Sequence, residues 1–184
     1  MQVEQIQDQI TEVLVTDVQI QQRIAEMAKI LDEKYAGKTP LLVGVLKGAV
    51  MFMADLSRAM TIPVNMEWMA LSSYGSGTVS SGVIRILKDL DADVHGRAII
   101  IVEDIIDSGL TLSWLASNLE ARGAESVEVV ALLRKPAAMK VEVKVGQVGF
   151  DIPNEFVVGY GLDYAERYRN LTSVAILAPS VYQQ

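Results

Sequence analysis

The 184-residue chain contains no cysteine and only one histidine. The absence of cysteine excludes disulfide scaffolds, thiolate metal sites and cysteine nucleophiles. A single histidine argues against a metal site built from several imidazoles and against a histidine-based catalytic triad. Chemistry that depends on thiols or on clustered histidines is therefore disfavoured for this protein.

Basic residues are also scarce, with 16 Lys and Arg against 23 Asp and Glu, which gives a formal net charge of −7 at pH 7. A protein that holds nucleic acid through its phosphate backbone normally carries a basic surface. We therefore expect no nucleic-acid partner. An acidic enzyme can still bind a small phosphorylated substrate through local backbone dipoles and a divalent cation.

Long hydrophobic runs are absent as well. The densest apolar run, Ala49 to Ala54, is bounded by Lys47 and Asp55 and is far shorter than the ~20 residues that a membrane span needs. The first ten residues, MQVEQIQDQI, carry acidic side chains where a signal peptide would be basic and then apolar. We expect a cytoplasmic protein without a membrane partner.

Strand-like and helix-like segments alternate along the chain, whose length suits a single domain. This alternation predicts an α/β fold with a central parallel sheet flanked by helices, and a small flap above the carboxyl edge of the sheet formed by short segments near the C-terminus. Apolar spacing and β-branched runs predict helices over Asp17–Tyr35, Val50–Met60 and around Leu112–Gly123, and strands over Leu41–Leu46, Pro63–Trp68 (at a sheet edge), Ile84–Ile86, Ala98–Val102 and Val127–Leu133.

The segment from Leu71 to Gly82 is rich in serine and glycine and has no periodic apolar face. A linker would be odd inside a domain of this size. Glycine- and serine-rich loops of this length more often act as lids or binding loops. We predict a mobile lid over residues 71–82, with Ser73 and Tyr74 as its contact residues.

The segment from Ile99 to Leu112 carries the clearest chemical signal. A buried strand ends in two adjacent carboxylates, Glu103 and Asp104, where open α/β sheets place their ligands. The next turn, Asp107 to Thr111, opens a helix whose free amides and dipole attract an anion. Because the two carboxylates would repel a bare phosphate, we expect them to hold ribose hydroxyls, with Mg²⁺ as an oxygen-seeking bridge nearby.

A plainer explanation exists for each of these residues taken singly. Glu103 and Asp104 could be solvated charges at a strand end, and Asp107 could be a helix N-cap. The combination is more specific than its parts, so we favour the functional interpretation. The sequence has no G-x-x-x-x-G-K-[ST] P-loop, and the G-x-G at Gly75 to Gly77 lies in the serine-rich segment.

The segment Glu103 to Thr111 resembles the phosphoribosyl-pyrophosphate (PRPP) signature of type I phosphoribosyltransferases. Other segments are similar to the hypoxanthine-guanine phosphoribosyltransferases of bacterial type, in the family's order and spacing from about Leu41 to Arg169. They are Leu46–Gly48 for the pyrophosphate loop, Ser72–Gly77 for the lid, and Arg134–Pro136 with Phe156–Tyr164 for the purine-binding hood.

The resemblance implies a single phosphoribosyltransferase domain over residues 1–184. Its core would comprise about 38–135 and 170–180, and its hood the amino-terminal residues with about 136–169. Members of the family usually form homodimers or homotetramers. The mean hydropathy of +0.28 also indicates that subunit interfaces cover part of the apolar surface.

The resemblance also implies roles around the sugar phosphate. Glu103 and Asp104 would hold the ribose hydroxyls and Mg²⁺, and Asp107 would face N7 of the purine as general base or acid. The 5′-phosphate would lie in a cradle of Ser108, Gly109, Leu110 and Thr111. Leu110 stands where some members carry lysine, which removes one phosphate contact and leaves the backbone cradle intact.

Further roles are implied for the leaving group and the base. Lys47, Gly48 and Arg169 would meet pyrophosphate, and the Leu46–Lys47 peptide is often cis in the family. Asp163 would support a second Mg²⁺ or the exocyclic group of the base. At the purine, Lys135 would donate to the 6-oxo group, Phe156 would stack on the ring and Val157 would hydrogen-bond through its backbone.

These roles predict purine salvage, in which PRPP and hypoxanthine, and also guanine, give IMP or GMP and pyrophosphate. Displacement of pyrophosphate from the ribose builds positive charge on the sugar, so catalysis needs a cation at the leaving group, carboxylates at the sugar and exclusion of water. Two alternatives stay open: a PRPP-sensing regulatory protein that no longer catalyses, and a phosphoribosyltransferase that prefers xanthine.

Overall fold

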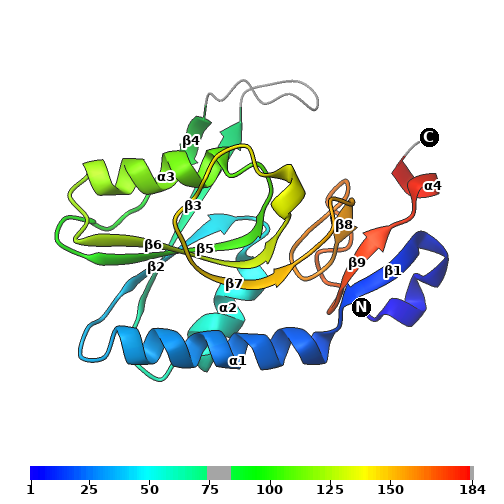
Figure 1. The fold of residues 1–184 in the computed structure, drawn as a ribbon, viewed down its shortest axis with the longest axis horizontal. Coiled ribbons are helices and arrows are strands. Elements are labelled where there is room, and N and C mark those ends of the chain that lie inside the picture. The colour runs from blue at the N-terminus through cyan, green and yellow to red at the C-terminus, as the bar shows by residue number, and fades with distance from the viewer. Residues whose placement is uncertain (74–83, 183–184) are drawn as a thin grey trace.

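A mostly parallel sheet forms the centre of the molecule (Figure 1). The computed structural model describes residues 1–73 and 84–182. In this part of the chain six strands pair in the order β4-β3-β2-β5-β6-β7, and only β4 runs antiparallel to its neighbour. Their bounds are β2 Leu41–Leu46, β3 Asn65–Ser73, β4 Ile84–Lys88, β5 Ala98–Ile106, β6 Ser126–Arg134 and β7 Val145–Asp151.

Helices cover both faces of this sheet, as the sequence predicts. Helices α1 (Asp17–Lys34) and α2 (Val50–Ala59) lie on one face, and α3 (Leu110–Ala121) lies on the other (Figure 1). Neighbouring residues of β5 divide between the two layers: Ile100 packs with α1 and α2, and Ile101 packs with α3. Continuous apolar strands of this kind are needed where both faces are covered.

Helix α1 shows how directly the sequence specifies these layers. Thr16 caps the helix, because its hydroxyl accepts from the Gln19 amide while the Gln19 side chain accepts from the Thr16 amide at 2.9 Å. This reciprocal pattern satisfies two otherwise free donors of the first turn. The residues at helical spacing, Ile20, Ile24, Met27 and Leu31, are all buried.

A second, antiparallel sheet stands at one end of the large sheet, close to both chain termini (Figure 1). Its strands are β1 (Ile10–Val15), β9 (Val174–Leu177) and β8 (Val157–Val158), in the order β1-β9-β8. The short helices η1 (Val3–Gln5), η2 (Gln7–Gln9) and α4 (Pro179–Tyr182) flank it, while η3 (Pro136–Ala138) follows β6. The small sheet has an apolar cluster of its own, which includes Val158, Leu171 and Ala175.

The small sheet and the turn after β8 form the hood of the structure. Two contacts fix this hood against the large sheet. The Tyr160 hydroxyl donates to Asp55 of α2 at 2.6 Å. Gly161, at φ 102°, lies so close to the Gly48 carbonyl that a Cβ at this position would overlap it. The hood is thereby held over the carboxyl ends of the parallel strands.

The topology corrects the expected division between core and hood. β7, which the resemblance assigns to the hood, is the edge strand of the large sheet, and β9, which it assigns to the core, belongs to the small sheet. The run around Val148 is too short to reveal its partner, which is β6. Arg23 of α1 then covers the outer edge by donating to the carbonyls of Val148 and Gly149, at 3.0 and 3.2 Å.

Strand β3 also differs from expectation in place and length. It is not at the sheet edge, because β4 pairs along it, with Ser72 opposite Arg85 and Ser73 opposite Ile84. Residues 71–73, assigned to the predicted lid, therefore continue the strand, since backbone pairing outweighs their polar composition. The rest of that prediction, residues 74–82 with Tyr74, lies outside the described residues. No helix in the described part is long and apolar enough to span a bilayer.

Candidate active site

The connectivity of the sheet creates a crevice between β2 and β5. These two strands are neighbours, and after β2 the chain moves to β3 on one side, whereas after β5 it moves to β6 on the other. Open α/β sheets bind their ligands at such a switch point, beyond the carboxyl ends of the strands. Lys47 and Gly48 follow β2, and Asp107 follows β5, so the topology brings the predicted segments to one place.

A cavity of about 320 Å³ opens at this position. Both the strand ends and the hood contribute charged residues to its lining, and the hood adds apolar ones. Nine of the predicted site residues line it together with Ile105 and Leu162: Lys47, Gly48, Asp104, Asp107, Lys135, Phe156, Val157, Asp163 and Arg169. Segments more than 120 residues apart in the sequence thus share one cavity.

The carboxylates at the end of β5 are closely surrounded by protein atoms. Asp104 is only 8% exposed and its Oδ1 accepts from the Ile105 amide at 2.7 Å. Gly48 lies directly against this side chain, so that a Cβ there would overlap Asp104 Oδ2. Glu103 Oε2 is buried and has no hydrogen-bond partner among the described residues.

Burial changes the acidity of both groups. It raises the pKa of Asp104 to about 6, although the hydrogen bond from Ile105 opposes the shift. Burial and the neighbouring Asp104 carboxylate raise the pKa of Glu103 well above its ordinary value. The Arg169 guanidinium also opposes the shift at Asp104. Carboxylates with pKa values raised by burial are common at functional sites. An unpartnered buried oxygen beside a second carboxylate fits a hard cation such as Mg²⁺, which prefers oxygen ligands.

The turn after β5 forms a smaller pocket of about 130 Å³ at the N-terminus of α3. Gly109 precedes the helix at φ 80°, a left-handed conformation that glycine adopts without strain. Glu103, Asp107, Ser108, Gly109 and Thr111 line this pocket, which shares Asp107 with the larger cavity. Leu110 is the first residue of the helix and is not part of the lining. Free amides at a helix start suit a phosphate.

Lys47 and Arg169, the two basic residues predicted to bind pyrophosphate, are paired with acidic residues of the hood. Lys47 Nζ lies 3.0 Å from Glu166 Oε2, and the Arg169 guanidinium lies 2.7 Å from Asp163 Oδ1 and 3.4 Å from Glu166 Oε1. Arg169 also donates to the Gly161 carbonyl at 2.8 Å. The Lys47 and Glu166 side chains are more than 60% exposed, and ion pairs of this kind contribute little stability, so an incoming polyanion can replace them.

The base end of the cavity is formed by β6 and the hood. Lys135 directly follows β6 and its amide donates to the Ile106 carbonyl at 2.9 Å, which places it beside the end of β5. Phe156 is 40% exposed, although it is a large apolar side chain. Val157 belongs to β8, the edge strand of the small sheet, so one side of its backbone has no strand partner in the described part of the chain.

Three further positions named by the resemblance complete the description. The Leu46–Lys47 peptide is cis. Ser73 ends β3, and Tyr74 lies outside the described residues. Asp163 has both oxygens engaged, because Oδ2 also accepts from the Glu166 amide at 2.9 Å.

Sequence reasoning missed several neighbours of the site. Glu166 was overlooked because an exposed acidic residue in a turn carries no distinctive pattern. Leu162 lies inside the resembling hood segment, yet its place in the cavity lining depends on the turn geometry. Tyr182 contacts Phe156 from the C-terminal helix, and no sequence signal links these two residues.

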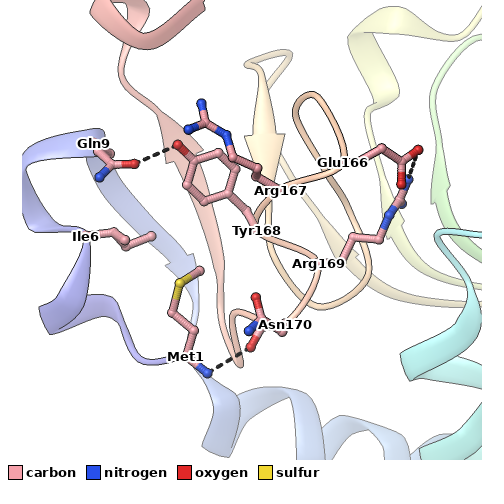
Figure 2. Close-up of a pocket in the computed structure, with 8 residues that line it drawn as sticks. All are labelled: Met1, Ile6, Gln9, Glu166, Arg167, Tyr168, Arg169 and Asn170. Carbon is pink, nitrogen blue, oxygen red and sulfur yellow. Dashed lines mark hydrogen bonds and ion pairs between the residues drawn. The ribbon is translucent and has the colours of Figure 1, made fainter.

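A separate cavity of about 520 Å³ lies on the hood. Figure 2 shows it between the N-terminal segment and the turn that carries Tyr168, whose hydroxyl donates to Gln9 at 2.6 Å. Glu166 and Arg169 also line it. Of the predicted site residues, only Arg169 lines this cavity as well as the site cavity.

Comparison with known proteins agrees with the sequence motifs. A model of the phosphoribosyl transferase domain matches residues 14–165. A hypoxanthine-guanine phosphoribosyltransferase from Mycobacterium bovis is 57% identical over 180 residues, which cover 95% of this chain and 89% of that protein. One from Bacillus subtilis is 51% identical over 174 residues, with 95% and 97% covered.

The fold comparison is equally close. The crystal structure of a hypoxanthine phosphoribosyltransferase from Staphylococcus aureus superposes with a TM-score of 0.94 at 41% identity and covers 97% of each chain. Matches of this extent span both the large sheet and the hood. The chain therefore belongs to the type I phosphoribosyltransferase family, among its hypoxanthine-guanine members.

Proposed function

We propose that this protein transfers the 5-phosphoribosyl group from PRPP to hypoxanthine and guanine, with formation of IMP or GMP and release of pyrophosphate. The observation that supports this most directly is the shared cavity. Lys47 and Arg169, suited to pyrophosphate, line the same space as Lys135 and Phe156, suited to a purine. The phosphate-sized pocket adjoins that space through Asp107.

Each substrate has a matching surface in the proposal. The amides of residues 108–111 and the dipole of α3 bind the 5′-phosphate. Glu103 and Asp104 orient the ribose through its hydroxyls. Lys47 and Arg169 exchange their carboxylate partners for pyrophosphate oxygens, which carry more charge. Residues Ile105 and Leu162 line the cavity with apolar surface and help to exclude water.

The reaction requires compensation of two charges. Positive charge builds on the ribose as its bond to pyrophosphate breaks, and the buried carboxylates face this charge in a low-dielectric position. Negative charge builds on the leaving group, where Lys47 and Arg169 act. Mg²⁺, when bound, supplies further positive charge at the pyrophosphate. Glu103 and Asp104 would hold it, and Asp163 would hold a second ion.

The described residues contain no cluster of three His, Cys, Asp or Glu side chains that would form a complete metal cage. This agrees with the usual behaviour of Mg²⁺, which binds through one or two carboxylates together with substrate oxygens and water. The unpartnered Glu103 oxygen supports such a shared site.

Proton transfer at the base is assigned to Asp107. This side chain is exposed and lines both pockets, and therefore lies between the positions proposed for the sugar and the purine. We propose that its carboxylate accepts the purine proton at N7 as the new bond to the ribose forms. A group in this position needs to be within hydrogen-bond reach of the base.

Base selection is assigned to Lys135, Phe156 and the Val157 backbone. A 6-oxopurine accepts a hydrogen bond from Lys135, whereas adenine presents an amino donor and leaves the ammonium unpaired. These contacts do less to reject xanthine, so a xanthine preference is the second candidate. Membership of the transferase family weighs against the PRPP-sensing regulator. We keep the cytoplasm as the proposed location, because PRPP is a charged metabolite that does not cross membranes.

One spectrophotometric assay tests the proposal. The purified protein is incubated with PRPP and Mg²⁺, and with hypoxanthine, guanine, xanthine or adenine in turn. We expect nucleotide formation with hypoxanthine and guanine, and loss of activity when EDTA removes the metal. Turnover with xanthine alone would favour the second candidate, and absence of turnover with all four bases would favour the regulator.

The variant Lys135→Ala tests base recognition within the same assay. Loss of a charged hydrogen bond should raise the KM for hypoxanthine by about 10-fold or more, and the KM for PRPP should stay within about 2-fold. Lys29→Ala, which removes an exposed lysine on α1, is the matched control. An unchanged KM for hypoxanthine would remove Lys135 from the purine site.

A further inference from the structure

Three aromatic rings meet at the purine end of the cavity. The Phe156 ring centroid lies 5.2 Å from that of Tyr182, with 34° between the ring planes. It lies 5.9 Å from Tyr164 in an edge-on arrangement at 89°, and the two tyrosines are 6.3 Å apart. Each separation lies in the range where aromatic pairs attract one another. The Phe156 ring therefore packs against the rings of both Tyr164 and Tyr182.

Tyr182 comes from a part of the chain outside the resembling motifs. It is the last residue of α4, which begins two residues after β9 ends at Leu177. The Leu177 amide donates to the Phe156 carbonyl at 3.0 Å, and Ile176 pairs with Val157. The strand that precedes α4 is thus tied to the backbone of Phe156, and α4 follows directly beside it.

The rings divide between two roles by position. Phe156 lines the substrate cavity, whereas neither Tyr164 nor Tyr182 is among the residues that line it. The tyrosines contact Phe156 from outside that cavity. Tyr182 is nearer to parallel with the Phe156 ring than Tyr164 is, so together the two restrict both the tilt and the edge position of the ring.

This restriction matters because Phe156 is 40% exposed. A half-exposed phenylalanine without such neighbours would sample several rotamers, and a purine would have to select one of them at an entropic cost. The two tyrosines hold the Phe156 ring in one orientation from outside the cavity, and the face of the ring toward the cavity stays free for a base.

We infer that Tyr182 is a positioning residue for purine binding, which holds the Phe156 ring in the orientation that stacks on the base. The inference rests on the proposed function, in which Phe156 is the stacking surface. It extends the purine site to the C-terminal helix. Tyr164 contributes the edge contact, and Tyr182 contributes the contact that limits ring tilt.

The test measures the KM for each substrate separately. Tyr182→Ala should raise the KM for hypoxanthine by about 2- to 10-fold, the range that corresponds to the loss of one aromatic pair. The kcat and the KM for PRPP should stay within about 2-fold of the unaltered protein. Tyr182→Phe keeps the ring and should restore the KM for hypoxanthine.

Val181→Ala provides a matched control on the same helix. Val181, like Tyr182, packs against the apolar cluster of the small sheet, but it carries no aromatic ring. Its truncation weakens the docking of α4 without removing the ring contact, so we expect little change in the KM for hypoxanthine. A rise equal to that of Tyr182→Ala would show that helix docking, and not the ring, is responsible, and would overturn the inference.

Phe156→Ala separates failure of the inference from failure of the proposed function. If Tyr182 acts through Phe156, a double variant that combines Phe156→Ala with Tyr182→Ala should show no larger KM for hypoxanthine than Phe156→Ala alone. A raised KM in Phe156→Ala with a normal KM in Tyr182→Ala, or additive effects, would overturn the inference and leave the function intact. An unaltered protein that forms no nucleotide would overturn the function itself.

Discussion

Gly48 follows β2 and Asp104 lies near the end of the neighbouring strand β5, and the two residues are in direct contact. Gly48 leaves the space that the Asp104 carboxylate fills. The same glycine contacts the hood, because its carbonyl lies against Gly161. One residue without a side chain therefore sets the distance between the pyrophosphate loop, the carboxylate pair and the hood.

The variant Gly48→Ala tests this close approach. The added methyl group would overlap Asp104 Oδ2, so either the loop or the carboxylate has to move. We expect kcat/KM for PRPP to fall by at least about 100-fold, since small displacements of positioning groups are costly. Gly37→Ala is an informative comparison, because nothing lies within 4 Å of its added Cβ, although its φ of 77° adds strain there. Near-normal activity of Gly48→Ala would contradict the packing argument.

Asp107 offers a separate prediction about the chemical step. Asp107→Asn keeps the shape of the side chain but removes the proton acceptor. We expect kcat to fall by about 100-fold or more, in the range of general acid–base contributions. PRPP affinity, measured by equilibrium binding, should change little. Turnover close to that of the unaltered protein would exclude Asp107 from proton transfer.

The buried carboxylate Asp104 is expected to serve activity while it lowers the stability of the folded protein at neutral pH. The folded-state pKa of Asp104 is raised to about 6 by burial, above the value of about 3.9 expected in the unfolded chain. The folded protein thus binds this proton more tightly. The stability that the group contributes is fully present below the unfolded pKa and is lost as the pH rises through about 6.

Asp104→Asn should therefore stabilise the metal-free protein at pH 7.5 while it abolishes most activity. We expect a gain of about 1 kcal/mol, seen as a rise in Tm of about 2–4 °C, and a smaller gain at pH 5. Asp8→Asn, at an exposed carboxylate in η2, is the control and should have no such effect. A lower Tm for Asp104→Asn at pH 7.5 would refute the cost of the buried charge.

At the scale of elements, α1 contributes stability and not chemistry. Its apolar stripe packs with α2 and with one face of the large sheet, and Leu31 is fully buried there. None of its residues lines the substrate cavity. Stability and catalysis should therefore be separable at this helix.

The variant Leu31→Ala tests that separation. Loss of the buried side chain should lower the free energy of unfolding by about 2–5 kcal/mol, measured by urea denaturation. The KM values and kcat at 20 °C should remain close to those of the unaltered protein. A large change in kcat without loss of stability would show that α1 influences the site.

Elements differ in how much of their position the sequence reveals. The capping residues Thr16 and Gln19 and the apolar spacing of α1 are local signals, and the helix begins and ends close to its predicted bounds. The buried run of β5 is equally local. β7 was misplaced because strand membership depends on pairing with β6, a contact between segments that lie apart in the sequence.

At the scale of the whole molecule, the surface predicts self-association. Val18 is 75% exposed and Leu87 is 61% exposed, and Ile30 and Met66 are also exposed apolar side chains. Together with the mean hydropathy of +0.28, they keep the homodimer or homotetramer as our prediction. Sedimentation equilibrium should give two or four times the 20.1 kDa of one chain. A mass of 20.1 kDa at micromolar concentration would contradict it.

The site contains residues that local sequence predicts and residues whose roles only a family resemblance suggests. Glu103 to Thr111 form one continuous segment whose strand end, carboxylates and helix start are encoded within nine residues, so the pocket that we propose for phosphate follows from local sequence alone. Lys135 and Phe156 reach the cavity from different elements. Their roles followed from a family resemblance, because residue type alone does not distinguish them from a solvated lysine and a core phenylalanine.

The sequence by itself determined the alternation of strands and helices and the family, and it predicted an anion-binding turn, because these depend on short-range periodicity and on contiguous motifs. The tertiary structure decided the order of the strands, the contact between Gly48 and Asp104, the pairing of Lys47 with Glu166 and the place of Tyr182 beside Phe156. These arise from packing between distant segments, where the energy of each contact depends on shape that local sequence does not carry.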